Sequence, residues 1–404
     1  MVGHPPRLAQ GGEEQVQALT PEQARRLLSD DGRAAVAVAS SHDLDASARI
    51  RTLEALRADV GTELAPLAYE QALLRRRALA KHSRGDELWW TSDALEQSSS
   101  AVVAAWRAQR YPDAALDLCC SVGGDLLALP DGSVGVDLDE ARLLLARANA
   151  EVLGRRVAVL RADVTTLPMP TTAEVFVDPA RRSGGRRHFD PRSYAPPLDT
   201  VLGWRSRVGR LGVKTAPGID HDALPPDVEV EVVSVRGDVK EAVLWAGEAH
   251  TGARRSAALL PAGDVLRDDA VPAAAVSEPG DYLLEPDGAV IRAHLVQQLA
   301  TQVDGRLLDP TIAYLTADAP SPTPFGRWYA VREVMPFSLK ALKARLRALD
   351  AGTLVVKKRG TAVEPEELRK RLKLTGSREM TVVLTRVSGR QVAMVVEPLA
   401  PSSG

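Results

Sequence analysis

Residues 115–140 read ALDLCCSVGGDLLALPDGSVGVDLDE, and this stretch decides the fold. A short apolar run ends at Cys120, a glycine pair follows at Gly123 and Gly124, and a second apolar run ends in the acid Asp137. Glycines let a backbone approach a ligand closely, and an acid at the tip of a strand accepts hydrogen bonds from ribose hydroxyls. The stretch therefore predicts a nucleotide-binding turn. The acid follows the glycines more closely than in the dinucleotide fingerprint, which suits a ligand without a pyrophosphate.

Composition sets the outer limits. The chain has 404 residues, of which 45% are hydrophobic and 26% are charged, and this is typical of a globular protein with more than one domain. The net charge is −2, so any basic surface must be local. There is no leader-like start and no apolar run long enough for a membrane span, which predicts a cytoplasmic protein with no membrane partner.

The two cysteines of the chain are adjacent, so they cannot supply a disulfide framework or a four-ligand zinc site. We interpret Cys119 and Cys120 as small apolar residues where a strand meets a turn, and we expect no metal. The alternative interpretation is a metal or redox site.

Strands alternating with helical spans follow the opening stretch, and they predict an α/β, doubly wound (Rossmann-like) sheet. A helix is expected over 139–152, and a closing antiparallel hairpin over 239–247 and 254–261. The other strands are expected at residues 114–120, 133–138, 157–164, 173–179, 210–218 and 228–235.

The flanking regions differ in character. Thr20, Pro21 and Gln23 are typical of a helix start, and helical spacing continues to about Lys81; Leu88–Trp90 is a possible short strand. Past the Asp-, Ala- and Pro-rich residues 262–285, the pattern predicts a C-terminal α+β module with the order α-β-α-β-β and a hairpin turning at Ser388 and Gly389. The expected regions are an N-terminal helical region (1–98), a catalytic domain (99–265) and a C-terminal module (280–404).

The motif residues resemble those of class I S-adenosylmethionine-dependent methyltransferases. Asp117 to Asp125 match their first motif, Asp137 matches their ribose-binding acid, and RADVTTLP at 161–168 is similar to the segment whose Asp contacts the adenine amine. The resemblance implies S-adenosylmethionine as the cofactor. It implies contacts to that cofactor from Asp117, Ser121, Gly123, Gly124, Asp137, Leu138, Asp163 and Val164.

Within that superfamily, the chain is most similar to RNA methyltransferases, including the cap guanine-N2 (trimethylguanosine synthase) family. The similarity rests on WWTSDALEQSSSAVVAAW followed by DLCCSVGGD, and it covers about residues 80–260. Gln97 and the serines after it are expected at the methionine end of the cofactor, where helix N–H groups face an anion. A plain serine-capped helix is the alternative.

A second motif, VFVDPARRSGGRRHFDPRSY, follows the fourth predicted strand at the edge where such sheets bind ligands. A carboxylate and a peptide carbonyl that accept both N–H bonds of an amine free its lone pair for attack on the sulfonium methyl. Asp178 and Pro179 supply these groups, since proline presets the carbonyl direction. Arg181 stands where an aromatic residue stacks in amino methyltransferases, and DPAR is also similar to the D-P-P-R of enzymes that methylate ring atoms. The catalytic candidates are therefore Asp178, Pro179 and Arg181.

The arginines that follow, Arg182, Arg186 and Arg187, lie among glycines and suit phosphate contacts. The alternative is a solvated loop after an ordinary Asp-Pro turn. Residues 336–378 hold twelve Lys or Arg against four Asp or Glu, and such a local excess suits a phosphate backbone or a solubilising face. The candidate RNA contacts there are Lys357, Lys358, Arg359, Arg369, Lys370, Arg371 and Lys373.

The region from about residue 280 also resembles the THUMP-like domains attached to RNA methyltransferases, which implies docking on structured RNA. The sequence therefore predicts methylation of a base in RNA, with tRNA favoured and rRNA as an alternative, and no obligate protein partner. Other hypotheses are methylation of DNA or a small molecule on the same fold, and an RNA-binding protein without catalysis.

Overall fold

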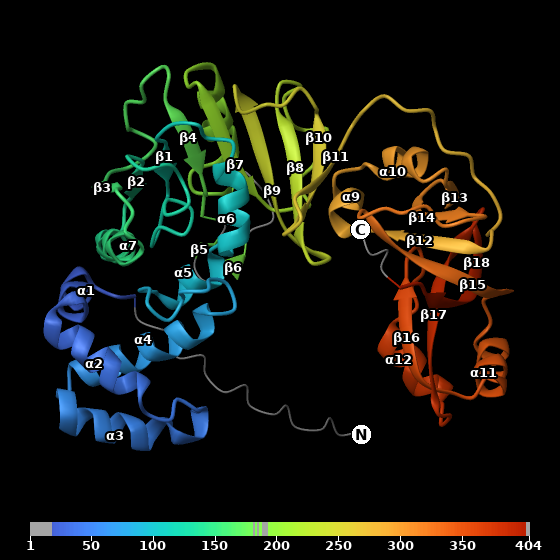
Figure 1. Cartoon of the computed structure of the whole chain (residues 1–404), viewed down its shortest axis with the longest axis horizontal. Coiled ribbons are helices and arrows are strands. Elements are labelled where there is room, and N and C mark those ends of the chain that lie inside the picture. Colours follow the sequence, from blue (N-terminus) through green and yellow to red (C-terminus); the bar gives the residue numbers. More distant parts are fainter. Residues whose placement is uncertain (1–17, 181, 184–185, 188–192, 401–404) are drawn as a thin grey trace, which may run out of the picture. The chain divides into compact units, whose positions relative to one another are not determined.

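The computed structural model describes residues 18–180, 182–183, 186–187 and 193–400. The chain divides into two units, residues 1–168 and 169–404, and Figure 1 labels the elements of each. The predicted division into regions 1–98, 99–265 and 280–404 stays a prediction.

The first unit begins with a helical cluster whose start follows from the sequence. The Thr20 hydroxyl accepts from the Gln23 amide at 3.2 Å, and the Gln23 side chain accepts from the Thr20 amide at 2.9 Å. This capping box, with Pro21 in the first turn, confirms the predicted helix start. Buried alanines let the helices approach closely. The elements are α1 (Pro21–Leu28), α2 (Asp30–Ser40), η1 (Ala46–Ala48), α3 (Arg49–Val60) and α4 (Leu64–Ala78).

A parallel sheet with a crossing helix completes the first unit. The strands β1, β2 and β3 pair in parallel in that order, and α7 connects β2 to β3 as predicted. Asp139 caps α7 by accepting from the Arg142 amide at 3.1 Å. The elements, in chain order, are α5 (Ser92–Gln97), α6 (Ala101–Ala108), β1 (Leu116–Leu118), β2 (Val134–Asp137), α7 (Glu140–Leu153) and β3 (Ala158–Arg161).

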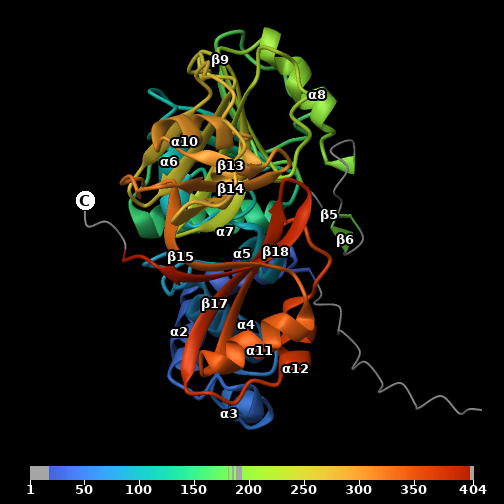
Figure 2. The same cartoon turned by 90° about the vertical axis from the view of Figure 1, so that its right-hand side faces the viewer.

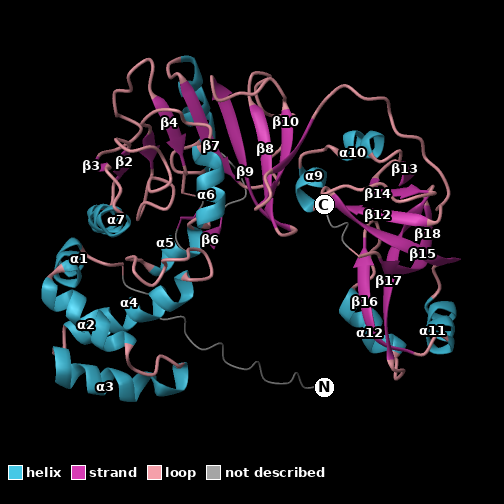
Figure 3. Ribbon diagram, viewed as in Figure 1, coloured by secondary structure: helices cyan, strands magenta, loops and turns pink. Residues whose placement is uncertain are grey.

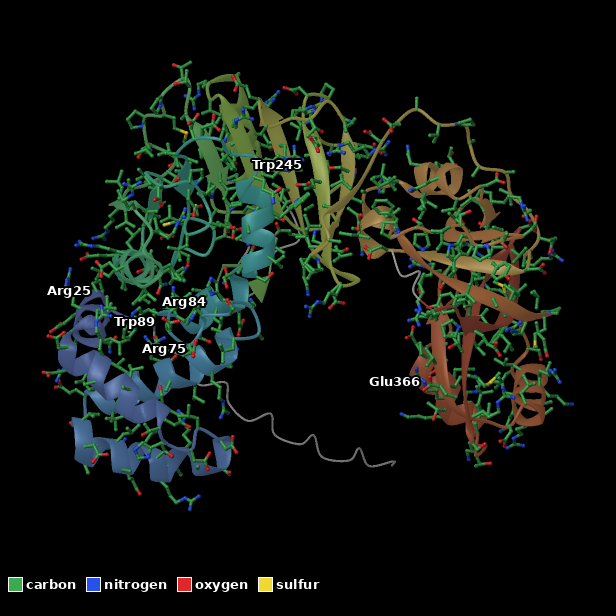
Figure 4. The ribbon with its side chains drawn as sticks, in the orientation of Figure 1. Arg25, Arg75, Arg84, Trp89, Trp245 and Glu366 are labelled. Atoms are coloured by element: carbon green, nitrogen blue, oxygen red, sulfur yellow. The ribbon has the colours of Figure 1, made fainter. Side chains whose placement is uncertain are left out.

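The predicted strand at Leu88–Trp90 is wrong, because this segment is irregular. The side chain of Asn149 satisfies the backbone of Trp89, so no neighbouring strand is needed. The Trp89 ring packs against the guanidinium of Arg75, whose Cζ lies 4.3 Å from the ring centroid (Figure 4). A buried apolar run can therefore lack strand geometry when a distant side chain binds its polar groups.

Two large sheets and a two-stranded sheet are described in the second unit. The first has the strand order β11-β10-β8-β9-β7-β4, with β4 and β7 parallel and β9 antiparallel to both of its neighbours. The predicted hairpin of 239–247 with 254–261 is wrong. Both edges of β9 are taken by β7 and β8, so β10 pairs in parallel with β8 instead. The strands are β4 (Glu174–Val177), β7 (Arg210–Thr215), β8 (Glu229–Val235), β9 (Asp238–Gly247), β10 (Arg255–Leu260) and β11 (Asp264–Arg267).

Short elements lie between β4 and β7. The strands β5 (Arg182–Ser183) and β6 (Arg186–Arg187) form an antiparallel pair. Helix α8 (Leu198–Leu202) and the turn η3 (Gly203–Ser206) then lead into β7, with Trp204 buried.

The other large sheet of the second unit has the order β13-β14-β12-β15-β18-β17-β16. Its first four strands were not predicted, because turn-rich residues around 262–285 looked like a boundary. The elements of this part are β12 (Tyr282–Pro286), α9 (Gly288–Arg292), α10 (Val296–Gln302), β13 (Arg306–Asp309), β14 (Ile312–Ala317) and β15 (Gly326–Pro336).

The last part confirms the predicted α-β-α-β-β order (Figure 3). Leucines of the helices at 339–348 (α11) and 365–372 (α12) pack in one apolar cluster with residues of the strands at 378–387 (β17) and 390–398 (β18). Figure 2 shows both helices with these strands. The hairpin turns at Ser388 and Gly389, both with positive φ as a two-residue turn requires. The elements are α11 (Leu339–Ala348), β16 (Ala351–Lys358), α12 (Pro365–Leu372), β17 (Arg378–Val387) and β18 (Arg390–Pro398). Among the described residues, no helix has the length and apolar character needed to cross a membrane.

Candidate cofactor and catalytic site

The glycine-containing loop after β1 folds back on β2. The amides of Cys119 and Cys120 both donate to the carbonyl of Val136, at 2.8 and 3.1 Å. The backbone takes positive φ at Cys119 (65°), Ser121 (52°) and Gly123 (89°), so the loop turns sharply. Such a turn presents backbone rather than side chains to a ligand.

The carboxylate of Asp137 organises this loop. Its Oδ2 accepts from the Ser121 amide at 2.8 Å, and its Oδ1 accepts from the Asp139 amide at 2.9 Å. Each oxygen has a second lone pair, and the side chain is only partly buried. The carboxylate is therefore held in place with acceptor capacity left over, as a ribose diol requires.

Gly124 lies against the segment that follows Gln97. A Cβ added to Gly124 would come within 3.3 Å of the Ser98 Cβ, so the structure brings this part of the loop to the end of α5. The ammonium of Lys81 fixes that end by donating to the carbonyls of Leu95, Glu96 and Ser98, at 2.6, 2.9 and 3.0 Å. The structure thus brings the segment after Gln97 close to the loop, with Lys81 as an unpredicted support, and the contact of Gln97 with the cofactor stays a prediction.

Three predicted cofactor contacts lie near the ends of neighbouring strands: Leu138, Val164 and Asp163, of which Asp163 is the predicted adenine contact. The amide of Ala162, which follows β3, donates to the carbonyl of Asp137 at the end of β2, at 3.2 Å. Leu138 is the next residue after Asp137, and Asp163 is the next residue after Ala162. Leu138 is 64% exposed, which is unusual for a leucine, while Val164 is buried. The hydroxyl and the amide of Thr165 donate to Asp163 Oδ1 and lower the pKa of this carboxyl below its usual value. Asp163 is thereby kept ionised as an acceptor.

Asp117 occupies a different environment. It lies on β1 with Gly135 of β2 as its register partner, and it is only 1% exposed. The structure therefore places its carboxylate in the interior and not at the surface. Its role as a cofactor contact stays a prediction.

The cysteines are explained by packing. A Cβ on Gly135 would lie 2.8 Å from the Cys120 sulfur and 2.6 Å from Leu126, so Cys120 fits into space that only glycine leaves. Burial, followed by the nearby Asp117 and Asp137, raises the pKa of the Cys120 thiol well above its usual value. A buried thiol of this kind is a poor nucleophile. Among the described residues, no group of three or more His, Cys, Asp or Glu could hold a metal ion.

Two further supports of the loop were not predicted. Asn149 on α7 donates to the carbonyls of Trp89 and Val122, both at 3.0 Å, and joins the loop to the segment before α5. Arg107 on α6 forms a buried ion pair with Asp125, which follows Gly124. Neither partner is close in sequence, and no local pattern identifies such pairs.

The second candidate motif follows β4. Asp178 Oδ2 accepts from the Lys214 ammonium on β7 at 2.7 Å, and the side chains are 26% and 4% exposed. Backbone bonds in both directions between Ala180 and Ala195 fix the chain just after Pro179. Lys214 was not predicted, because a single lysine in an apolar strand gives no sequence signal of its partner.

The arginines of this motif are only partly within the described residues. Arg181 lies outside them. Arg182, Arg186 and Arg187 lie in the paired strands β5 and β6, but their side chains are outside the description. Their predicted roles stay predictions.

In the C-terminal module, the lysines and arginine of the predicted 357–359 contact are engaged within the protein. Lys357 donates to Glu285 at 2.5 Å, and Lys358 donates to Glu364 at 2.6 Å. Arg359 lies 4.0 Å from Glu285 and packs over the ring of Tyr314. These cations are already neutralised by internal partners, so they are less suited to phosphate contacts than the sequence suggested.

The cations of the second basic run are presented differently. Arg369, Lys370 and Arg371 on α12 are exposed, as is Lys373 after it. The Arg369 guanidinium donates to the Leu354 carbonyl at 2.9 Å. None of the other three forms an ion pair in the described part of the chain. This helix therefore offers the freer cationic surface of the module.

Comparison with known proteins identifies the family. The chain is 40% identical over 354 residues to an uncharacterized S-adenosylmethionine-dependent methyltransferase of Mycobacterium tuberculosis H37Rv, a match that covers 84% of this chain and 98% of the relative. A protein of M. tuberculosis CDC 1551 with the same description matches equally well. The chain belongs to the S-adenosylmethionine-dependent methyltransferases. S-adenosylmethionine is its cofactor, and the geometry around Asp137 suits the ribose of this ligand.

The other comparisons concern the fold and the modules of this methyltransferase. A solved protein of Porphyromonas gingivalis W83, presented as a candidate methyltransferase, has a TM-score of 0.71 at 20% identity over 91% of this chain and 99% of its own. It shares the fold. The family model of the THUMP domain-like proteins matches residues 326–398, and a model of a domain of unknown function matches residues 20–78. The predicted α/β methyltransferase fold with a THUMP-like C-terminal module is confirmed.

Proposed function

We propose that this methyltransferase modifies a base in structured RNA, with tRNA as the favoured substrate. The observation that carries the proposal is the pairing of a methyltransferase with a THUMP domain-like module at residues 326–398. The exposed cations of α12 in that module support it, since phosphate backbones are bound by surface lysine and arginine. In this proposal, residues 99–265 are the catalytic domain and residues 280–404 the RNA-binding module.

In the proposed site, the loop after β1 holds the cofactor. Asp137 accepts from the ribose hydroxyls, Gly123 and Gly124 let the backbone approach, Asp163 contacts the adenine, and Leu138 is a further cofactor contact. The exposure of Leu138 and the ionised carboxylate of Asp163 support these roles. The further proposed cofactor contacts are Asp117, Ser121, Val164 and Gln97.

The proposed acceptor contacts are Asp178 and the carbonyl of Pro179. S-adenosylmethionine supplies an electrophilic methyl group when it is bound. Asp178 is partly exposed and fixed on one side, so it can accept a hydrogen bond from a base nitrogen and orient its lone pair. Arg181, Arg182, Arg186 and Arg187 follow in sequence and are proposed to contact the substrate phosphates.

The test is transfer of labelled methyl from S-adenosylmethionine to RNA from a strain that lacks the gene. We expect labelled tRNA and a methylated nucleoside in its digest. Label found only in rRNA would support an RNA substrate but would identify it as rRNA instead of tRNA. Label in DNA alone, or in no nucleic acid while the protein binds S-adenosylhomocysteine, would contradict the proposal.

A further inference from the structure

We propose that Lys214 positions the Asp178 carboxylate as a hydrogen-bond acceptor, and that the methylated atom is therefore a nitrogen that carries a hydrogen. This inference rests on the proposed function and deepens it. It assigns Lys214 as a positioning residue and names the chemical class of the acceptor.

Lys214 is a buried cation within an apolar strand. Its side chain is 4% exposed, and its neighbours Val213 and Thr215 are fully buried on β7. Taking an ammonium out of water is costly unless a charged partner compensates, and replacing such a pair with apolar residues is often neutral or stabilising. Packing alone would be served by methionine. The hydrogen bond to Asp178 is a polar contact that methionine could not make.

The pair is asymmetric in exposure. Asp178 is 26% exposed against 4% for Lys214, so the carboxylate lies between the buried ammonium and the more open side. The ammonium donates to Oδ2 at 2.7 Å, while Oδ1 receives no hydrogen bond from the described residues. Lys214 thus fixes one oxygen of the carboxylate, and we assign the other oxygen to the substrate.

The acceptor role of the Asp178 carboxylate has a chemical consequence. An ionised carboxylate accepts hydrogen bonds and donates none, whereas a protonated one can donate. The Lys214 ammonium donates to Asp178 Oδ2 at 2.7 Å, so the carboxylate already acts as an acceptor at this oxygen. Asp178 then pairs with an N–H group and has nothing to offer a ring nitrogen that carries only a lone pair.

The transfer balances with this arrangement. The nitrogen lone pair forms the bond to the methyl carbon, and the carbon–sulfur bond breaks with its electron pair left on sulfur. The products are the methylated base and S-adenosylhomocysteine. The nitrogen loses a proton to Asp178 or to water. An exocyclic amine fits, and so does a ring nitrogen that bears hydrogen; a ring nitrogen without hydrogen and a ring carbon do not.

The test combines variants with the identity of the product. Single-turnover methyl transfer to tRNA from the deletion strain is measured for wild type, Lys214→Met, Lys214→Arg, Asp178→Asn and the Lys214→Met/Asp178→Asn double variant. We expect Lys214→Met to lower the rate at least about tenfold and Lys214→Arg to restore much of it. We expect the double variant to be no slower than Asp178→Asn, since both changes disable the same contact between Lys214 and Asp178. The affinity for S-adenosylhomocysteine should stay within a few-fold throughout.

Three results would overturn the inference. The first is a double variant whose loss of methyl-transfer rate equals the product of the two single losses, which would show that Lys214 acts independently of Asp178. Another is a Lys214→Met rate near that of wild type, and the third is a product methylated on a ring carbon or on a nitrogen that had no hydrogen. If Lys214→Met does not fold, the transfer rate of Lys214→Arg and the identity of the methylated atom still test the inference. Failure of the proposed function is distinct, because wild type itself would then leave the RNA unlabelled.

Discussion

Asn149 binds both backbone polar groups of Trp89. Its Oδ1 accepts from the Trp89 amide at 2.7 Å, and its Nδ2 donates to the Trp89 carbonyl at 3.0 Å and to the Val122 carbonyl at 3.0 Å. One side chain of α7 therefore joins the segment before α5 to the loop that follows β1. The cofactor loop depends on a residue that contacts it from a distant part of the sequence.

Removing this link should destabilise the first unit. Asn149→Ala leaves three buried backbone groups without partners, so we expect the free energy of unfolding to fall by about 2–4 kcal/mol, with weaker S-adenosylhomocysteine binding. Urea unfolding measures the first effect and calorimetry the second. Glu151→Ala on the same helix is the control, because Glu151 is exposed and makes only a surface ion pair with Arg147. Equal stability of the two variants would refute the role of Asn149.

The ribose contact is tested at Asp137. Charge-assisted hydrogen bonds contribute about 1.5–3 kcal/mol each, so Asp137→Ala should weaken S-adenosylhomocysteine binding at least about tenfold in calorimetry. Asp139→Ala is the matched control: it removes the α7 cap and should cost about 1 kcal/mol of stability with little loss of affinity. A folded Asp137→Ala protein with wild-type affinity would rule out the assignment.

The RNA surface is tested by comparing two triple variants. Replacing Lys370, Arg371 and Lys373 with Ala should flatten the salt dependence of RNA affinity by about two to three units, because each phosphate contact releases counterions. Replacing Lys357, Lys358 and Arg359 should flatten it less, because Glu285 and Glu364 already neutralise these cations. The measurement is a salt titration of tRNA binding. A larger effect of the 357–359 variant would assign the RNA contact to these three residues instead of α12. If neither variant changes the salt dependence, neither group of residues binds RNA phosphates.

A pair of histidines predicts a pH effect. His221 is 5% exposed and its ring stacks on His294, with centroids 4.6 Å apart. Burial, then the nearby His294 and Arg255, lowers the pKa of His221 from 6.5 to about 4, against the smaller opposing effects of Asp222 and Asp220. Between pH 6.5 and about 4, His221 is thus neutral in the folded protein and protonated in the unfolded chain. Stability is complete above pH 6.5 and is lost as the pH falls toward 4, by up to about 3 kcal/mol.

Thermal unfolding between pH 7.5 and 4.5 measures this effect. His221→Gln should flatten the dependence on pH in that range, while His250→Gln should keep the wild-type dependence. An unchanged slope in His221→Gln would assign the acid sensitivity to other groups.

The sequence predicted features whose signal is local. Thr20 and Gln23 lie three residues apart in their capping box, and the loop before Asp137 is recognisable from glycines and strand ends alone. Pairs joined across the fold were missed, since Asn149 and Trp89 are 60 residues apart and Lys214 and Asp178 are 36 apart.

The same reason explains two misjudged patterns. The run of 254–261 follows β9 in sequence, but the edges of β9 are occupied, so proximity gave the wrong partner. Lys357 belongs to a basic run, yet its partner Glu285 lies 72 residues earlier on another strand. Local charge density cannot show which cations are already paired.

Methyl transfer to tRNA from a strain that lacks the gene tests the central claim most directly. Wild type and Asp178→Ala are incubated with labelled S-adenosylmethionine, and the nucleosides of the digested tRNA are separated by mass spectrometry. The account predicts one labelled nucleoside with wild type and a rate lower by roughly a hundredfold or more with Asp178→Ala, at nearly unchanged cofactor affinity. Unlabelled RNA with a wild-type protein that binds the cofactor, or equal rates for both proteins, would contradict it.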